Sequence, residues 1–230
     1  MGTADRMQRD RLAKRARILD AARELFVERG IEAVTLREIA QRIEYSTTAI
    51  YVQFKDKQDL VTQMVGEDFE KFTSALGAKA RVVDPVERLV QLGEAYVEFA
   101  LGMPQHYRLL FMTPAAKSAA PPKEPPGHDG FTLLLSTVEE CIAAGRFRPG
   151  ITDARGVAQG VWAGVHGLVS LLIVMSGDPH FEWRSPAALL EHVSGRMLDG
   201  LLRERRPVQA AAAPAKPAAR PGAAKPRRGR

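Results

Sequence analysis

Side chains that commonly perform catalysis are sparse in this sequence and are not arranged for it. There is one cysteine, Cys141, and the five histidines are His106, His128, His166, His180 and His192. None of them has the spacing of metal ligands, and no Gly-x-Ser-x-Gly, phosphate-binding loop or dinucleotide fingerprint is present. A Cys141–His166 pair is conceivable in space, but a cysteine on an apolar helix face is usually inert. We therefore expect no enzyme, no cofactor and no metal site.

A second group of side chains suits contact with DNA. Residues 46–52 read Ser-Thr-Thr-Ala-Ile-Tyr-Val, and Lys57 follows five residues later. Small hydroxyl side chains at a helix start let the backbone approach the bases, and the helix N-terminus favours phosphate. The hydroxyl of Tyr51 could donate to a phosphate oxygen, and Lys57 could reach the same strand. Ile50 would anchor the segment in a core.

The surrounding sequence predicts helices that would position this segment. Apolar residues three and four apart predict a first helix over about Arg9–Arg29, and Gly30 ends it. The capping box Thr35-Leu36-Arg37-Glu38 begins a second helix, and Glu44-Tyr45 makes the turn before a third. Asp56 can cap a long fourth helix. Two short helices joined by a turn and packed on a longer one are typical of a helix-turn-helix module, whose second short helix enters the major groove.

Several of these residues carry a family resemblance. The run Thr35–Ala40, then Ser46, Ile50-Tyr51, Phe54-Lys55, Lys57 and Leu60, resembles the DNA-binding domain of TetR-family transcriptional regulators over about residues 14–62. One position departs from the pattern, because the family usually has glycine in the turn where this chain has Glu44. A non-glycine residue with a positive φ costs roughly 1 kcal/mol. We expect the turn to differ slightly without loss of the fold.

The resemblance implies roles for individual side chains in binding double-stranded operator DNA. It implies phosphate contacts for Thr35, Tyr51 and Lys57. It implies reading of base edges by Arg37, Thr47, Thr48 and Gln53. An arginine facing guanine is the strongest such pairing, worth about 1–3 kcal/mol of discrimination.

Other interpretations of these side chains stay open. Thr35 and Ser46 could serve only as helix caps, and both roles can coexist. Tyr51 could pack in the core. Arg37 and Gln53 could belong to a solvated helix face.

A DNA-binding domain with one recognition helix needs a second subunit, because one short helix contacts too few base pairs to select a genomic site. Members of the family generally form homodimers through their last two helices, which here are about 154–176 and 185–205. The first of these is rich in glycine and alanine, which permit close helix approach, and the second has a broad apolar stripe.

The larger C-terminal part is expected to enclose a ligand pocket, as regulators of this family usually do. The segment Trp162–Leu168 resembles the Trp-x-x-x-His-Gly signature of one C-terminal subclass. The residues that could line the pocket are Tyr96, Phe99, Met103, His106, Tyr107, Phe111, Trp162 and His166. The alternative is plain core packing, with His166 bonded to a backbone carbonyl beside the tryptophan. Since no acidic or basic cluster is evident, we expect an apolar or weakly polar effector.

The excess of basic residues is confined to one end of the chain. The net charge is +6, yet residues 1–206 hold 27 basic and 27 acidic side chains, so the excess lies in 207–230. The overall charge therefore does not indicate that the folded part binds nucleic acid. The apolar stretch 157–175 contains Gln159, His166 and three glycines, which favours a buried helix over a membrane span. No secretory signal is visible, and we expect a cytoplasmic protein without a membrane partner.

These observations predict an all-α fold with an N-terminal three-helix helix-turn-helix domain and a C-terminal helical bundle that forms a homodimer. We expect a basic N-terminal arm at 1–17, the DNA-binding domain at 18–62, and the ligand-binding and dimerisation domain at 63–206. Residues 207–230, rich in Ala, Pro, Lys and Arg, would be a disordered tail. Its final Arg-Gly-Arg resembles the core of an AT-hook, although diffuse attraction to phosphate is the alternative.

The function expected from this organisation is that of a transcriptional repressor. A dimer would bind a palindromic operator, and an effector that prefers another separation of the two recognition helices would release it. The main alternative is a nucleoid-associated protein without sequence preference. Binding to specific and scrambled DNA at about 150 mM salt, where non-specific contacts weaken, would distinguish the two.

Overall fold

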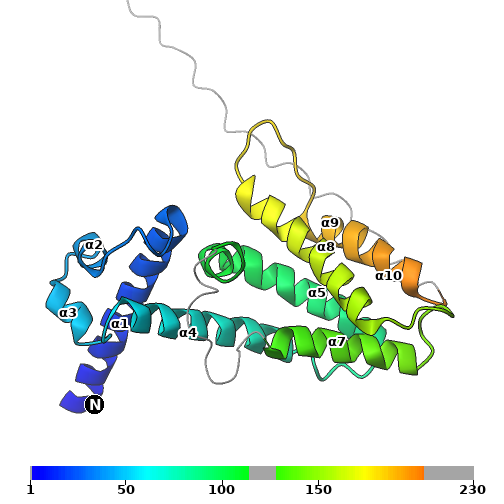
Figure 1. Ribbon diagram of the computed structural model, residues 1–230, viewed down its shortest axis with the longest axis horizontal. Coiled ribbons are helices and arrows are strands. Elements are labelled where there is room, and N and C mark those ends of the chain that lie inside the picture. Colours follow the sequence, from blue (N-terminus) through cyan, green and yellow to red (C-terminus); the bar gives the residue numbers. More distant parts are fainter. Residues whose placement is uncertain (1, 114–127, 205–230) are drawn as a thin grey trace, which may run out of the picture.

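A computed structural model describes residues 2–113 and 128–204, and all the regular structure in this part of the chain is helical. The predicted all-α class is confirmed. Three helices form the N-terminal domain, a long fourth helix leaves it, and the remaining helices form a C-terminal bundle (Figure 1). The tail at 207–230 and most of the proline-rich stretch between Thr113 and Gly130 lie outside the described residues.

The first helix, α1 (Thr3–Arg29), begins earlier than the sequence pattern suggested. Most of the expected arm at 1–17 is therefore the first half of this helix. Residues 3–17 contain no glycine or proline and are rich in Arg, Ala, Leu, Lys, Met and Gln, which favour helix. Nearly all side chains of residues 5–17 are exposed and form no apolar stripe, so no apolar periodicity indicated that this part is helical.

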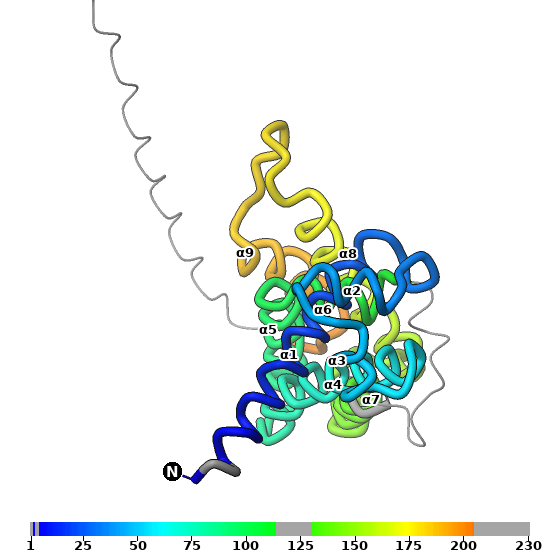
Figure 2. The backbone as a smooth tube through the Cα atoms, turned by 90° about the vertical axis from the view of Figure 1, so that its left-hand side faces the viewer, coloured from blue at the N-terminus to red at the C-terminus, as the bar shows by residue number. Residues whose placement is uncertain are grey.

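The N-terminal domain is held together by a small apolar core. Its further helices are α2 (Leu36–Arg42), which packs against α1, and α3 (Thr47–Tyr51), which packs against α2. Helix α4 (Lys57–Gly77) also contacts α1. The core side chains, all less than 2% exposed, are Ile18, Ala22, Phe26, Val34, Ile39, Ala40, Ile50, Phe54 and Leu60. Figure 2 shows α2 and α3 stacked beside α1 at this end of the molecule.

Local hydrogen bonds fix where the short helices begin. The hydroxyl oxygens of Thr35 and Ser46 accept from the backbone N–H groups of Glu38 and Ala49, at 3.3 and 3.2 Å. The turn between α2 and α3 is left-handed at Glu44, with φ of 59°, the only non-glycine residue with positive φ in the described part of the chain. Glu44 therefore adopts the conformation for which the family uses glycine, and the turn is retained.

The C-terminal bundle surrounds α5 (Pro85–Gly102), which packs against α4, α7 (His128–Ala143) and α8 (Ala154–Val174). Between α5 and α7 the chain makes a short α6 (Pro104–Tyr107) that continues as a π-helical turn, η1 (Arg108–Met112). Both lie against α1 as well as against the bundle. Helix α4 extends from the N-terminal domain along α5 and α7 (Figure 1), so α4 and α6–η1 join the two domains.

The last helical segment is continuous but irregular. It consists of α9 (Pro186–Leu190), the π-helical η3 (Glu191–Gly195) and α10 (Arg196–Leu201). One small residue of α8, Gly164, serves a close contact within the chain. A Cβ added at Gly164 would lie 3.0 Å from Sδ of Met197 and 3.2 Å from Cγ1 of Val193. At least part of the glycine pattern attributed to dimerisation therefore seats the chain's own last helix.

Among the described helices, α8 alone is long and apolar enough to cross a membrane by length and composition. Only 39% of its most apolar window is buried inside the molecule. A core helix of a soluble protein meets the same criterion, so this is weak evidence for a membrane span. The buried face of α8 packs on α5 and α7, while Leu171 and Val174 are exposed.

Candidate functional site

Helix α3, the segment expected to contact DNA, has one buried anchor and an exposed face. Ile50 is fully buried and fixes the helix to the core, whereas Tyr51 is 56% exposed and Val52 is 68% exposed. Thr48 is exposed and Thr47 is half-buried. The exposure of Tyr51 excludes core packing as its role in this conformation. A short helix anchored by one buried isoleucine can offer its hydroxyl-bearing face to a groove without changing its own structure.

Two of the predicted contact residues already have partners in the protein. Oε1 of Gln53 lies 3.5 Å from Nε of Arg11 on α1. Nζ of Lys57, at the first position of α4, donates to the backbone carbonyl of Glu32 at 3.2 Å. These contacts tie the ends of the recognition segment to α1 and to the loop before α2. If either side chain contacted DNA, it would share its present hydrogen bond with the DNA or lose it.

The entry to α2 is an ion-paired capping box. Oε2 of Glu38 accepts from the backbone N–H and the hydroxyl of Thr35, both at 2.8 Å, and Oε1 pairs with Arg29 at 2.9 Å. The backbone and side-chain hydrogen bonds from Thr35, with a smaller effect of Arg29, hold the pKa of Glu38 at about 2. The carboxylate therefore stays charged and the cap stays formed at neutral pH. Arg37, the next residue but one after Thr35, is exposed.

Two arginines of α1, Arg15 and Arg17, contact aromatic rings of the N-terminal domain. The guanidinium of Arg15 lies over the ring of Phe54, 5.1 Å from its centre, and pairs with Glu67 at 2.5 Å. Arg17 lies 5.0 Å from the ring centre of Tyr45 and donates to its hydroxyl at 3.1 Å. In this conformation both arginines stabilise the packing of α1 on its neighbours.

The C-terminal bundle encloses an apolar cavity of about 280 Å³ between α4, α5, η1, α7 and α8. Its lining side chains are aromatic or aliphatic, with two glycines, and none carries a charge. They are Phe69, Phe72, Leu76, Leu89, Leu92, Gly93, Tyr96, Leu110, Phe111, Gly130, Phe131, Leu134, Val161, Trp162 and Val165.

Polar groups meet at one wall of this cavity. The hydroxyl of Tyr96 accepts from Nε1 of Trp162 at 3.2 Å and lies 3.1 Å from both the Tyr107 hydroxyl and Nδ1 of His166. The Tyr107 hydroxyl is 2.6 Å from the same His166 nitrogen. Burial raises the pKa of both tyrosines, so their hydroxyls remain neutral. Nδ1 of His166 thus belongs to a cluster of side-chain polar groups.

The predicted pocket residues divide between this cavity and its surroundings. Tyr96, Phe111 and Trp162 line it. Tyr107 and His166 lie behind Tyr96 in the polar cluster and not among the lining residues.

The other predicted pocket residues lie elsewhere. Phe99 packs its ring on Phe72, which itself lines the cavity, with ring centres 5.3 Å apart. Met103 ends α5 and is 41% exposed. His106 faces Asp68 on α4, with Nδ1 2.7 Å from Oδ1.

Sequence reasoning missed the contributions of α4 and α7 to the cavity. Phe69, Phe72 and Leu76 on α4, with Phe131 and Leu134 on α7, form much of its wall. The available signal was the apolar stripe of α4, which continues past the N-terminal domain it helps to complete.

The one cysteine of the chain, Cys141, is buried. Cys141 is fully buried in a separate apolar cluster with Val138 and Phe147, and burial raises the pKa of its thiol to about 11. It is therefore protonated and unreactive at neutral pH. Within the described residues, no group of three or more His, Cys, Asp or Glu side chains could hold a metal ion.

Comparison with known proteins agrees with this arrangement. Residues 18–64 match the family model of bacterial regulatory proteins of the tetR family, and residues 89–197 match that of the tetracyclin repressor-like C-terminal domain. Together these matches cover more than half of the chain. The chain belongs to the TetR family of bacterial regulatory proteins.

Individual relatives are more distant. The HTH-type transcriptional activator FasR of Mycolicibacterium smegmatis is 32% identical over 108 residues, 46% of this chain and 48% of that protein. The HTH-type transcriptional repressor Rv1474c of Mycobacterium tuberculosis is 39% identical over 62 residues, 27% and 33% of the two chains. The match thus spans about half or less of these relatives' length.

Solved structures share the fold over most of the chain. The transcriptional regulator FadR of Bacillus subtilis, crystallised with stearoyl-CoA, has a TM-score of 0.63. It is 18% identical, with 80% of this chain and 98% of that chain covered. At this identity the likeness concerns the fold alone.

Proposed function

We propose that this protein is a sequence-specific transcriptional repressor that binds a palindromic DNA operator as a homodimer in the cytoplasm. The observation that carries the proposal is the exposed, anchored α3 in a chain that belongs to the TetR family. In this proposal Thr47 and Thr48 read base edges together with Arg37 and Gln53. Phosphate contacts come from Thr35, Ser46, Tyr51 and Lys57, next to the helix starts.

The dimer is proposed to form through α8 and the segment 186–201. Two large apolar side chains near the end of α8, Leu171 and Val174, are 52% and 60% exposed in the single chain. Exposed apolar side chains of this size are best covered by a partner, and a twofold arrangement would place two copies of α3 on one duplex. Burial of this surface in a dimer would also explain why α8 is apolar, without a membrane span.

The proposed effector is a small uncharged molecule, or the uncharged part of a larger one, held in the 280 Å³ cavity. No lysine, arginine, histidine or acidic residue lines the cavity, so an ionised group buried there would lack a partner. The polar atoms of the lining, on Tyr96 and Trp162, already bond each other. The structurally similar FadR of Bacillus subtilis was crystallised in complex with stearoyl-CoA. The apolar lining of the cavity in the present protein suits the acyl chain of such a molecule.

An experiment on DNA alone tests the proposed function. We expect the full-length protein to select one recurring palindromic sequence from random duplexes and to prefer it strongly over a scrambled copy at about 150 mM salt. Equal binding to the selected and scrambled duplexes would instead identify a protein that binds DNA without sequence preference.

The cavity is tested separately with an apolar probe. N-phenyl-1-naphthylamine is uncharged, and its fluorescence rises in apolar surroundings. Val165 is 3% exposed and lines the cavity, so Val165→Phe would fill part of it. We expect the probe affinity to fall by about tenfold or more, equivalent to about 1.4 kcal/mol.

The matched control for this test is Val83→Phe, made at a site that is 89% exposed and outside the cavity. It should leave probe binding unchanged, and thermal unfolding of both variants checks that the fold persists. Equal probe affinity for Val165→Phe and the unmodified protein would mean that the cavity is not the binding site.

A further inference from the structure

The cavity of the C-terminal bundle offers a bound molecule very few polar partners. Of the described side chains that line it, only those of Tyr96 and Trp162 carry polar atoms. Nε1 of Trp162 is a donor only, and it already donates to the hydroxyl oxygen of Tyr96 at 3.2 Å. A hydrogen bond from these side chains to a bound molecule must therefore be made at Tyr96, or it must first break the existing bond.

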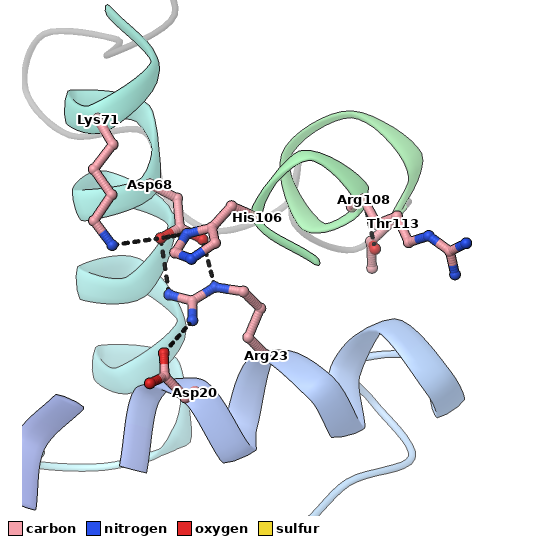
Figure 3. A network of polar contacts seen from close by, with 7 residues as sticks. All are labelled: Asp20, Arg23, Asp68, Lys71, His106, Arg108 and Thr113. Atoms are coloured by element: carbon pink, nitrogen blue, oxygen red, sulfur yellow. Dashed lines mark hydrogen bonds and ion pairs between the residues drawn. The ribbon is translucent and has the colours of Figure 1, made fainter. Parts of the chain in front are cut away.

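The buried charges between the two domains are paired with one another and do not take part in the cavity wall. Asp68 is fully buried and accepts from two guanidinium nitrogens of Arg23, at 2.8 Å each (Figure 3). Nδ1 of His106 lies 2.7 Å from Oδ1 of the same carboxylate. None of these three residues lines the cavity. Recognition of a polar group inside the cavity therefore depends on neutral hydrogen bonds.

The groups behind Tyr96 form a chain of hydrogen bonds. The hydroxyl of Tyr107 lies 2.6 Å from Nδ1 of His166, and the hydroxyl of Tyr96 lies 3.1 Å from both that nitrogen and the Tyr107 oxygen. If Nδ1 is an acceptor, Tyr107 donates to it and Tyr96 donates to Tyr107. Trp162 donates to Tyr96, so every donor proton in this chain has an acceptor.

The opposite tautomer of His166 leaves one proton of the chain without an acceptor. With a proton on Nδ1, His166 donates to Tyr107, and Tyr107 donates to Tyr96. The Tyr96 oxygen then accepts two hydrogen bonds, while its own proton has no acceptor among these groups. Tyr96 is only 6% exposed, and a buried donor without a partner is unfavourable. The distances therefore favour the tautomer in which Nδ1 accepts.

We infer that the effector carries a hydroxyl or N–H group that donates to the hydroxyl oxygen of Tyr96, which makes Tyr96 the specificity-determining residue of the cavity. Its oxygen has two lone pairs, of which one accepts from Trp162, and its proton is donated to Tyr107. The second lone pair can accept from a bound molecule without breaking any bond of the chain. A carbonyl or ether oxygen, in contrast, would find no donor.

The effector class is thus an apolar molecule with one neutral hydrogen-bond donor, such as a phenol or a long-chain alcohol. The inference rests on the proposed function, because it specifies the effector of the same cavity.

Three aromatic probes that differ in one substituent test this inference. Naphthalene has no polar group, 2-methoxynaphthalene has only an acceptor, and 2-naphthol has a donor and is uncharged at neutral pH. Equilibrium dialysis against the full-length protein measures each dissociation constant. We expect 2-naphthol to bind about threefold to tenfold more tightly than 2-methoxynaphthalene, although the latter is the more apolar molecule. Val165→Phe, which fills part of the cavity, should weaken the binding of all three probes.

Two tyrosine variants separate the cavity wall from the groups behind it. Tyr96→Phe removes the acceptor, so we expect the preference for 2-naphthol to disappear while naphthalene binding stays unchanged. Tyr107→Phe is the matched control, because it removes a hydroxyl from the same cluster. In this variant Tyr96 can donate to Nδ1 of His166, 3.1 Å away, and it keeps its second lone pair. The preference should therefore persist, and thermal unfolding of both variants checks that the fold is retained.

The possible results distinguish the inference from the proposed function. If the unmodified protein bound 2-naphthol no more tightly than 2-methoxynaphthalene, or if Tyr96→Phe kept the preference, the inference would be overturned and the proposed function would stand. Loss of the preference in both tyrosine variants would also contradict a specific role of Tyr96. If no probe bound, or if Val165→Phe weakened none of them, the effector site of the proposed function would be overturned together with the inference.

Discussion

Replacing Asp68 with alanine should destabilise the protein by about 3–5 kcal/mol, because the guanidinium of Arg23 would then stay buried without its principal partner. Arg23 is 3% exposed, and two of its nitrogens bind Asp68 at 2.8 Å. For a chain of this size the expected fall in Tm is roughly 6–20 °C. Thermal unfolding followed by circular dichroism measures it.

Asp20 supplies the matched control for this prediction. It binds the same arginine, at 2.8 Å, but its side chain is 69% exposed. Asp20→Ala should therefore cost no more than about 1 kcal/mol, as exposed ion pairs generally do. If the two variants unfolded at the same temperature, the buried pair would not be what holds α1 to α4.

Replacing Arg37 with alanine should lower operator affinity by about 1–3 kcal/mol for each half-site and relax sequence selectivity at one position of each. Arg37 is the second residue of α2 and is exposed. The family resemblance gives it contact with a base edge, and an arginine can bond two acceptors of guanine at once. Selection of random duplexes by the variant would show which position loses its preference.

Arg42, at the other end of α2, is the control. Its Nη2 lies 3.3 Å from Glu24 of α1, and half of its side chain is exposed. Arg42→Ala should leave the selected sequence unchanged. A uniform loss of affinity for all sequences in Arg37→Ala would assign Arg37 to phosphate instead, and an unchanged affinity would place it on a solvated face.

The N-terminal domain could be predicted from sequence because its determinants are local. The capping box Thr35–Glu38, the cap at Ser46 and the apolar spacing of α1 each specify structure within a few residues. Even the departure at Glu44 was located correctly, since a tight turn between two helices requires one left-handed residue. The start of α1 was missed because exposed helix lacks periodicity.

The cavity could not be predicted in the same way, because it is made where five separate helical elements meet. Aromatic spacing on α5 and η1 identified Tyr96 and Phe111 but also included Met103 and His106, which face elsewhere. Spacing indicates which residues share a face and not which neighbour that face meets.

The sequence carries a signal for the buried ion pair between Arg23 and Asp68. Asp68 continues the i, i+4 apolar series of α4 that runs through Leu60 and Met64 to Phe72, and Arg23 precedes the core residue Phe26 on α1. A charged residue within an apolar stripe needs a buried partner of opposite charge. Asp68 on α4 and Arg23 on α1 therefore predict an ion pair between the two helices.

In the proposed function, two copies of α3 read two half-sites on one face of the duplex. Hydroxyl-radical footprinting of the full-length protein on its selected operator tests this most directly. We predict two protected stretches related by a twofold axis, with centres about 34–36 Å apart or a multiple of that distance. Continuous protection without a twofold axis, or the same protection on scrambled DNA, would contradict the account.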